Sequence, residues 1–469
     1  IDNWLNKTFN NIMKLIKDDP TLIPYQDALQ ARYHYFTRLK DSLIDGHGSL
    51  KNAASWYYHF GIHPVLENGR MTGWLYREWA PSALALFLYG DLNNWNRESL
   101  PLQRKANGEW EIFLPFEEFK DKLLHQSRYK VRVMGGWGDQ ERIPLFCNRA
   151  VQCPFTQDFS ASAWLPSEPY QWKNQNFRPD RSTTLKIYEA HVGMASEEQK
   201  IASFDEFRIN ILPRIKWLGY NAIQLMAIQE HPYYGSFGYQ VSNFFGVSSR
   251  FGTPDELKAL VDAAHGMGIA VIMDLVHSHS AKNTREGICG FDGTVWQFFH
   301  DGPKGDHWLW GSKVFNYGQR GVLRFLLSNV RYWLEEYQLD GFRFDGVTSM
   351  LYEHHGLGVG FGHYDTYFQG VDGDAIAYLQ LATSLMKEIT PHAIAIAEDV
   401  SGMPGLCRPI DEGGMGFDYR LSMGLPDFWI KTLKEKRDED WSVFDIWGVM
   451  LNRRKKEGHI AYVECHDQA

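Results

Sequence analysis

Several features that indicate particular classes of protein are missing from this sequence. Its 469 residues include five cysteines, which are scattered without the spacing of a metal site: Cys147, Cys153, Cys289, Cys407 and Cys465. Such an odd, scattered set favours a reducing compartment over a disulfide framework. No apolar run is long enough to cross a bilayer, and no charged-then-apolar signal segment opens the chain.

Strong charge and phosphate-binding loops are also missing. The formal net charge is −9 and the sequence pI is about 6.1. This mild acidity argues against nucleic acid or an anionic membrane as the main partner. No GxGxxG or GxxxxGK[ST] motif supports a nucleotide-binding sheet. Aromatic residues, in contrast, make up 15% of the chain, with 17 Trp and 23 Tyr. Most of them belong in a core, and some could stack on sugar rings.

The pattern of apolar, polar and turn residues changes along the chain and predicts four regions. Residues 1–50 form a helical segment, because their apolar residues recur at helical spacing. Residues 51–165 hold short alternating runs separated by turns, typical of a β-sandwich. Residues 166–180 read as a linker, and residues 181–469 alternate strands with amphipathic helices. The last region has a short insert at 280–320.

We expect the last region to be an α/β fold, a (β/α)₈ TIM barrel with its active residues at the carboxyl ends of the strands. An open doubly wound sheet is the alternative. The predicted strands cover 185–189, 222–225, 270–274, 341–345, 393–397, 417–420 and 460–464. Predicted helices cover 204–218, 254–267 and 322–337. The sequence contains no candidate for the eighth strand of such a barrel. Because of this, we expect the natural protein to continue beyond Ala469. The chain does not begin with Met, so we also expect it to be a processed or trimmed product.

Three predicted strand ends carry carboxylates: Asp345, Glu398 and Asp467. Arg343 and Asp345 share one side of their strand, since side chains alternate, and a guanidinium favours the ionised carboxylate. The set suits attack at an acetal carbon, which needs one carboxylate nucleophile and one carboxylic acid. Asp345 fits the nucleophile. Glu398 ends an apolar run, and this setting should raise its pKa as an acid catalyst requires.

Supporting groups accompany these carboxylates. His466 and His279, with Asp467, could hydrogen-bond sugar hydroxyls and stabilise a cationic transition state. For Asp274, a structural role such as capping a loop or pairing with Arg343 is weighed equally with contact to the substrate. His277 and His279 resemble a His-x-His metal pair, but we favour hydrogen-bonding roles. The loop at 233–240 is rich in glycine and aromatic residues, and Tyr239 offers a ring face for a sugar.

Four blocks of the sequence resemble the signature regions of the α-amylase superfamily of glycoside hydrolases and transglycosidases. They are DLVHSH at 274–279, GFRFD at 341–345, AED at 397–399 and ECHD at 464–467. Longer stretches are similar to eukaryotic-type 1,4-α-glucan branching enzymes, namely 341–352, 397–404, 234–240 and 251–254. Residues 77–81 and 90–95 resemble the family 48 carbohydrate-binding module.

This resemblance implies roles for eight residues. Asp345 would be the nucleophile, Glu398 the acid/base and Asp467 the transition-state stabiliser. The first sugar subsite would be lined by Tyr239, Asp274, His279, Arg343 and His466. Family members cut an α-1,4 link, hold the glucan covalently and pass it to a 6-hydroxyl. No cofactor or metal is expected, and the insert at 280–320 has no clear Asp/Asn calcium loop.

Two rivals stay open at this point. An amylase-type or debranching hydrolase would use the same carboxylates, and a non-catalytic glucan-binding protein would use none. The expected partner is an α-1,4-glucan such as amylose, glycogen or amylopectin, with neither nucleic acid nor membrane involved. We expect a cytoplasmic monomer, or a plastid protein if the source is a plant or alga.

Overall fold

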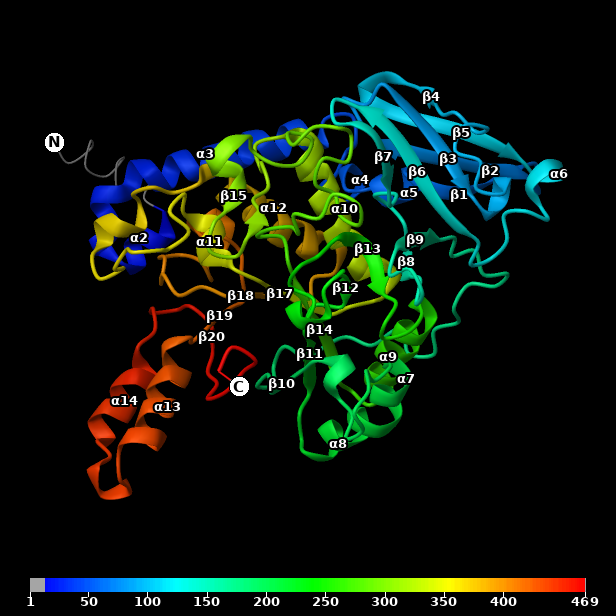
Figure 1. Cartoon of the computed structure of the whole chain (residues 1–469). Helices are drawn as coiled ribbons and strands as arrows, with labels where there is room; N and C mark the ends of the chain where they lie inside the picture. Colours follow the sequence, from blue (N-terminus) through cyan, green and yellow to red (C-terminus); the bar gives the residue numbers. More distant parts are fainter. Residues whose placement is uncertain (1–12, 469) are drawn as a thin grey trace. The chain divides into compact units, whose positions relative to one another are not determined.

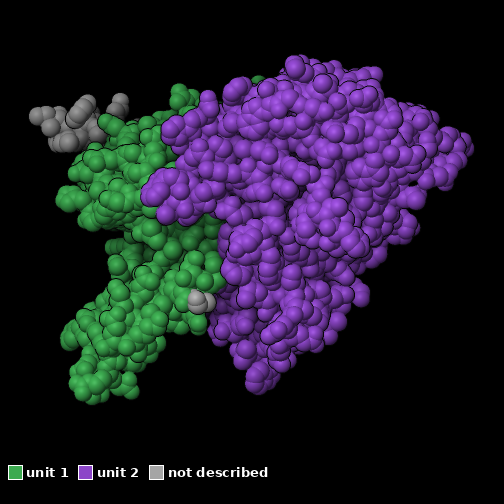
Figure 2. Space-filling view, in the orientation of Figure 1, with its two compact units in different colours: residues 1–50, 341–469 green, residues 51–340 purple. Residues whose placement is uncertain are grey.

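The computed structural model describes residues 13–468, so the first 12 residues of the predicted helical segment lie outside it. The chain divides into two compact units, which Figure 2 colours separately. Unit 1 takes in the residues up to Leu50 and those from Gly341 onward, and unit 2 is Lys51–Asp340. Within residues 13–468, no helix has the length and apolar character needed to cross a membrane.

Two antiparallel sheets make up the amino-terminal half of unit 2. One has the strand order β1-β2-β5-β4, and the other includes β8, β9, β6 and β3, with β7 paired to β6. Their bounds are β1 Gly61–Glu67, β2 Arg70–Trp79, β3 Ala85–Gly90, β4 Gln103–Arg104, β5 Glu109–Pro115, β6 Arg128–Gly135, β7 Gly138–Arg142, β8 Arg149–Gln152 and β9 Phe159–Ser162. Trp79 and Trp110 are buried, whereas Trp95 and Trp137 are exposed. Short helices α5 (Trp56–His59) and α6 (Phe116–Phe119) flank these strands.

The second sheet also recruits two strands from beyond residue 165. β13 (Asn243–Ser248) pairs in parallel with β8, and β12 (Gln229–Glu230) pairs with β13. Residues 166–180 contain neither helix nor strand. They are nevertheless held in place, because the backbone N–H groups of Lys173 and Asn174 donate to the Asp262 carboxylate at 3.0 and 2.8 Å.

Three parallel strands follow in unit 2 (Figure 1): β10 (Ile187–Ala190), β11 (Ala222–Leu225) and β14 (Ala270–Leu275). Strands β11 and β14 are buried throughout, as expected for a parallel sheet that is covered on both faces. The helices are α9 (Pro254–Gly266) and α10 (Arg320–Glu336). A third predicted helix, 204–218, is divided into α7 (Phe204–Glu206), the π-helical segment η5 (Phe207–Ile211) and α8 (Leu212–Trp217). Pro213 has no N–H to donate, which accounts for the break in the regular ladder.

Unit 1 holds four parallel strands in the order β17-β18-β19-β20: Gly341–Phe344, Ile394–Ala397, Tyr419–Leu421 and His459–Ile460. Its helices are α2 (Lys14–Asp18), α3 (Gln26–Ile44), α11 (Val347–Leu351), α12 (Gly373–Ile389), α13 (Gly424–Glu435) and α14 (Val443–Leu451). The predicted amino-terminal helix is therefore present as α3, which packs on α12. Helices α13 and α14 lie side by side and project from the rest of unit 1 (Figure 1).

All seven predicted strands exist in the described residues, three in unit 2 and four in unit 1. The prediction at 222–225 matches β11 in both bounds, whereas the other six strands begin or end at different residues. The largest error is the last strand, predicted at 460–464 and observed at His459–Ile460. Residues 461–468 are half-buried or exposed and contain no strand, with a turn at 466–468, so β propensity there is not supported by packing.

Helix α9 generates a first prediction. Its cap, Thr253, accepts from the Glu256 N–H at 3.2 Å, and the Glu256 carboxylate accepts from the Thr253 N–H at 2.6 Å. Replacing Thr253 by Ala removes the hydroxyl acceptor and should lower the free energy of unfolding of unit 2 by about 1 kcal/mol. Urea unfolding followed by circular dichroism measures this loss. Thr253→Ser keeps the acceptor and should unfold close to wild type; equal midpoints for all three proteins would contradict the assignment.

Candidate active site

Asp345 and Glu398 stand beside each other at the ends of neighbouring strands. In the parallel register of β17 and β18, Phe344 is the partner of Ala397, so the next residue of each strand is a carboxylate. The ladder continues past them, because the Glu398 N–H donates to the Phe344 carbonyl at 3.1 Å and the Val347 N–H to the Glu398 carbonyl at 3.0 Å. The backbone therefore places the two residues at equivalent positions on adjacent strands, which lie about 4.8 Å apart.

One guanidinium joins the two carboxylates. Arg343 Nη1 lies 3.1 Å from Asp345 Oδ1, and Arg343 Nη2 lies 3.2 Å from Glu398 Oε1. The Arg343 side chain is only 2% exposed, and both carboxylates are largely buried. Arg343 and Asp345 lie on the same face of β17, as the strand period predicts. The link to Glu398 comes from the register between strands.

Glu398 has the environment of an acid with a raised pKa. Burial is the main cause, and the negative charges of Asp345 and Asp467 add to it, whereas Arg343 and a hydrogen bond from the Gly346 N–H oppose it. That N–H donates to Glu398 Oε2 at 2.6 Å. The predicted direction of the Glu398 pKa shift is therefore present, with desolvation as its largest cause.

Asp467 and His466 follow the short strand β20 within a turn. His466 Nε2 lies 3.4 Å from Asp467 Oδ1, and the Asp467 side chain is 46% exposed. Asp467 is close enough to Glu398 to raise the pKa of that carboxyl. Unit 1 therefore brings together five of the eight predicted residues: Arg343, Asp345, Glu398, His466 and Asp467.

Unit 2 brings together the other three, Tyr239, Asp274 and His279. The Tyr239 hydroxyl donates to Asp274 Oδ2 at 2.6 Å, and Asp274 is fully buried at the end of β14. His279 Nε2 lies 2.7 Å from the Tyr239 carbonyl oxygen, and its Nδ1 lies 2.9 Å from Ser278 Oγ. A carbonyl only accepts, so Nε2 carries the proton in this arrangement and Nδ1 accepts from the serine. These bonds fix the loop that carries Tyr239.

The glycines of the 233–240 loop have a packing role. Gly238 has a φ of +95°, and a Cβ there would lie 2.0 Å from the Ala227 carbonyl oxygen. The loop needs glycine at this position to lie against its own unit, whether or not a ligand approaches.

Next to each of these clusters, one residue of the same unit has a structural role. His277 Nε2 lies 2.9 Å from Asn329 Oδ1, and burial lowers the pKa of His277 to about 3. His277 is thus a buried hydrogen-bonded histidine, in line with the role we favoured. Asp399 organises the loop after β18, since its carboxylate accepts from Thr348 Oγ1 at 2.7 Å and from Ser401 Oγ at 2.6 Å.

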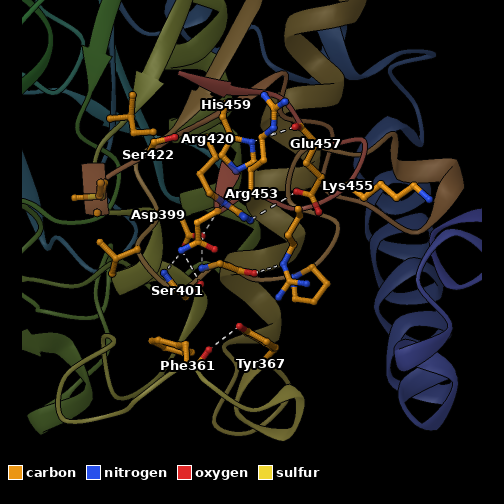
Figure 3. A pocket seen from close by; sticks show the side chains of 18 of the residues that line it. Phe361, Tyr367, Asp399, Ser401, Arg420, Ser422, Arg453, Lys455, Glu457 and His459 are labelled. Atoms are coloured by element: carbon orange, nitrogen blue, oxygen red, sulfur yellow. Dashed lines mark hydrogen bonds and ion pairs between the residues drawn. The ribbon is translucent and has the colours of Figure 1, made fainter. Parts of the chain in front are cut away.

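A cavity of about 960 Å³ in unit 1 extends from this loop (Figure 3). Three of the residues that line this cavity form an ionic group: Arg420, on β19, lies 3.0 Å from Asp399 and 3.7 Å from Glu457. Neither Asp345 nor Glu398 lines it. Arg420 and Glu457 were not predicted from the sequence, because no motif surrounds either of them. Their pairing depends on the fold.

Comparisons with known proteins add a second kind of evidence. The family described as carbohydrate-binding module 48 (isoamylase N-terminal domain) matches residues 59–145, and the α-amylase catalytic domain matches residues 209–312. A 1,4-α-glucan-branching enzyme of Yarrowia lipolytica is 49% identical over 476 residues, covering 97% of this chain and 68% of that protein. The chain belongs to the 1,4-α-glucan-branching enzyme family.

Another member of this branching-enzyme family, from Rhizophagus irregularis, is 48% identical over 459 residues, covering 97% of this chain and 66% of that protein. The chain thus spans about two thirds of the length of the branching enzymes it matches. A crystal structure of the pullulanase SAP of Group B Streptococcus in complex with maltotetraose aligns with a TM-score of 0.62 and 18% identity, covering 87% of this chain and 56% of that one. The last likeness concerns the fold alone.

The pKa of Glu398 generates a second prediction. A carboxyl whose folded pKa lies above its ordinary 4.5 holds its proton more tightly in the folded state, so the free energy of unfolding falls as pH rises from about 4.5 through the raised value. Glu398→Gln removes this titration and can still accept from the Gly346 N–H. The variant should therefore gain stability relative to wild type over that pH window.

Urea unfolding at a series of pH values checks this expectation. The exposed Glu67→Gln serves as the control for the loss of a carboxyl group at the surface. A Glu398→Gln difference that is flat, or that favours wild type as pH rises, would contradict the raised pKa.

Proposed function

We propose that this chain carries the catalytic centre of a 1,4-α-glucan branching enzyme. It cleaves an α-1,4-glucan, retains the cut segment as a covalent glycosyl-enzyme and transfers it to a 6-hydroxyl, which creates an α-1,6 branch. The observation that carries the proposal is the pairing of Asp345 and Glu398 across one guanidinium. Their positions on adjacent strands and their shared contact with Arg343 support a short carboxyl separation, as in retaining enzymes, where it is about 5–5.5 Å. Membership of the branching-enzyme family supports the choice of transfer.

In the first step, Asp345 attacks the anomeric carbon of the donor sugar. The bond from that carbon to the departing 4-oxygen breaks, and Glu398 gives its proton to this oxygen. Arg343 orients Asp345 by donating a charge-assisted hydrogen bond to it, and burial raises the pKa of Glu398 so that it keeps its proton at higher pH. Asp467 and His466 face the positive charge that develops on the sugar ring and stabilise it.

In the second step, the 6-hydroxyl of an acceptor glucose attacks the anomeric carbon. Glu398, now ionised, accepts the hydroxyl proton while the bond to Asp345 breaks. The proton and both carboxylates return to their starting states. If water reaches the intermediate first the result is hydrolysis, so exclusion of water decides between the two outcomes. Neither a cofactor nor a metal takes part in these steps.

The first sugar subsite is assigned to Tyr239, Asp274, His279, Arg343 and His466. Tyr239 and Asp274 are joined by their short hydrogen bond, so the ring and the carboxylate present one fixed surface. We assign His279 mainly a positioning role, because its two ring nitrogens contact Tyr239 and Ser278.

The wider architecture belongs to the same proposal. We place a helical segment at 1–50, a glucan-binding β-sandwich at 51–165, a linker at 166–180 and a (β/α)₈ barrel from 181, with its insert at 280–320. The parallel strands of the two units support the barrel. The partner is an α-1,4-glucan such as amylose, glycogen or amylopectin. A monomer in the cytoplasm, or in a plastid, completes the prediction.

Incubation with amylose tests the function. Branching predicts fading iodine colour and new α-1,6 links at constant reducing ends. Rising reducing ends would indicate a hydrolase, and unchanged amylose that is retained on the protein would indicate binding alone.

The nucleophile gives a third prediction. Asp345→Ala should lower the branching rate by roughly 10⁴-fold or more, because no other group can form the covalent intermediate. Retention on an amylose column should survive. The exposed Asp438→Asn, also in unit 1, is the matched control and should branch normally. A near-normal rate for Asp345→Ala would show that the nucleophile is wrongly assigned.

A further inference from the structure

A small hairpin in unit 2 exposes large apolar side chains. Strands β15 (Asp306–His307) and β16 (Ser312–Lys313) pair antiparallel, and the turn between them carries Trp308, Leu309 and Trp310. Trp308 is 71% exposed and Trp310 is 37% exposed. These residues lie in the 280–320 insert, for which the sequence predicted no role. Exposing two tryptophans on a turn is costly unless something covers them.

The hairpin is fastened to the segments that carry Tyr239 and His279. Ser280, the residue after His279, exchanges two backbone hydrogen bonds with Lys313, at 2.9 and 2.8 Å. Gln240, the residue after Tyr239, donates from Nε2 to the Trp310 carbonyl at 3.4 Å. Movement of the hairpin is therefore coupled to both predicted subsite segments.

The Trp310 ring is supported from behind. It stacks on the buried His307 ring with centroids 3.9 Å apart and an interplanar angle of 9°, and the backbone N–H of Trp310 donates to His307 Nδ1 at 3.2 Å. Its centroid lies 5.0 Å from that of His279, with the rings tilted by 54°. His307 thus covers one face of the indole and holds its direction. The ring stands next to His279, at the edge of the Tyr239–Asp274–His279 cluster.

The carboxylate at the base of the hairpin is paired with two lysines. Asp306 lies 3.0 Å from Lys282 Nζ and 3.1 Å from Lys313 Nζ. These pairs compensate the Asp306 carboxylate at the base of the hairpin. A flat, supported indole beside a hydroxyl and a carboxylate suits a neutral ring with apolar C–H faces and polar edges, which is the chemistry of a glucose unit.

We propose that Trp310, with Trp308, forms an aromatic platform that binds a glucose unit of the α-glucan next to the Tyr239–Asp274–His279 cluster. This inference rests on the proposed function and names a further binding residue for it. The platform extends the contact of the chain with glucan beyond the first subsite. It therefore sets how strongly a long chain is held, while the bond-breaking groups are Asp345 and Glu398.

The test compares Trp310→Ala with Trp310→Phe in the full chain. Removing the ring should weaken binding of maltoheptaose by roughly five- to tenfold, the range expected for one lost aromatic contact. It should raise KM for amylose by a similar factor, with kcat within about twofold of wild type. Trp310→Phe keeps a stacking face and should restore most of the affinity. Calorimetric titration measures binding, and the iodine and α-1,6-link assays give KM and kcat.

The matched control is Trp217→Ala. Trp217 is 83% exposed at the end of α8, also in unit 2, and should leave both constants unchanged. Equal effects of the two alanine variants, or a fall in kcat with unchanged KM, would overturn the platform. Loss of self-association on sedimentation, with sugar binding intact, would also overturn it and would assign the hairpin to a protein contact.

The two proposals fail separately. If wild type binds maltoheptaose but forms no α-1,6 links, and Trp310→Ala still weakens binding, the branching proposal fails and the platform stands. If wild type branches amylose and Trp310→Ala behaves like wild type, the platform fails and the branching proposal stands.

Discussion

The candidate site depends on one guanidinium placed between two carboxylates. Burying Asp345 and Glu398 side by side would be costly for two unpaired anions, because like charges and desolvation both disfavour ionisation. Arg343 offsets this cost with one nitrogen on each carboxylate. The arrangement needs β17 and β18 in a particular register, since a slip by one residue would turn Glu398 to the opposite face. The buried apolar residues of both strands hold that register.

The predicted residues form two clusters of different chemistry. In unit 1, Arg343, Asp345 and Glu398 form an ionic cluster fixed by strand register. In unit 2, Tyr239, Asp274 and His279 are linked by hydrogen bonds between a loop and a strand end. Each cluster is ordered by elements of its own unit. Preorganisation of this kind is what electrostatic catalysis and oriented sugar binding require, because little reorganisation then accompanies the reaction.

Sequence periodicity predicted which side chains share a face of one strand, but it did not predict the contacts between side chains of two strands. The alternation of GFRFD was sufficient to place Arg343 and Asp345 on one face. It could not place Glu398 on the second nitrogen of Arg343, because that contact depends on the register of a strand 50 residues away. The same limit applies to Arg420 and Glu457. Trp310 was missed because nothing in its local sequence shows that His307 supports it. The last strand was predicted too long, since its β-like sequence is only partly buried.

The shared guanidinium also suits the proposed reaction as a whole. Before attack, Asp345 is ionised and Glu398 carries a proton. In the covalent intermediate Asp345 is esterified and Glu398 is ionised. One negative charge is therefore present in both states, and it moves from one side of Arg343 to the other. A lysine, with its compact charge, would have to favour one carboxylate, whereas the two arms of an arginine reach both. Arg343 can thus stabilise both states while its side chain stays in place, and the proton of Glu398 moves without leaving an uncompensated buried charge.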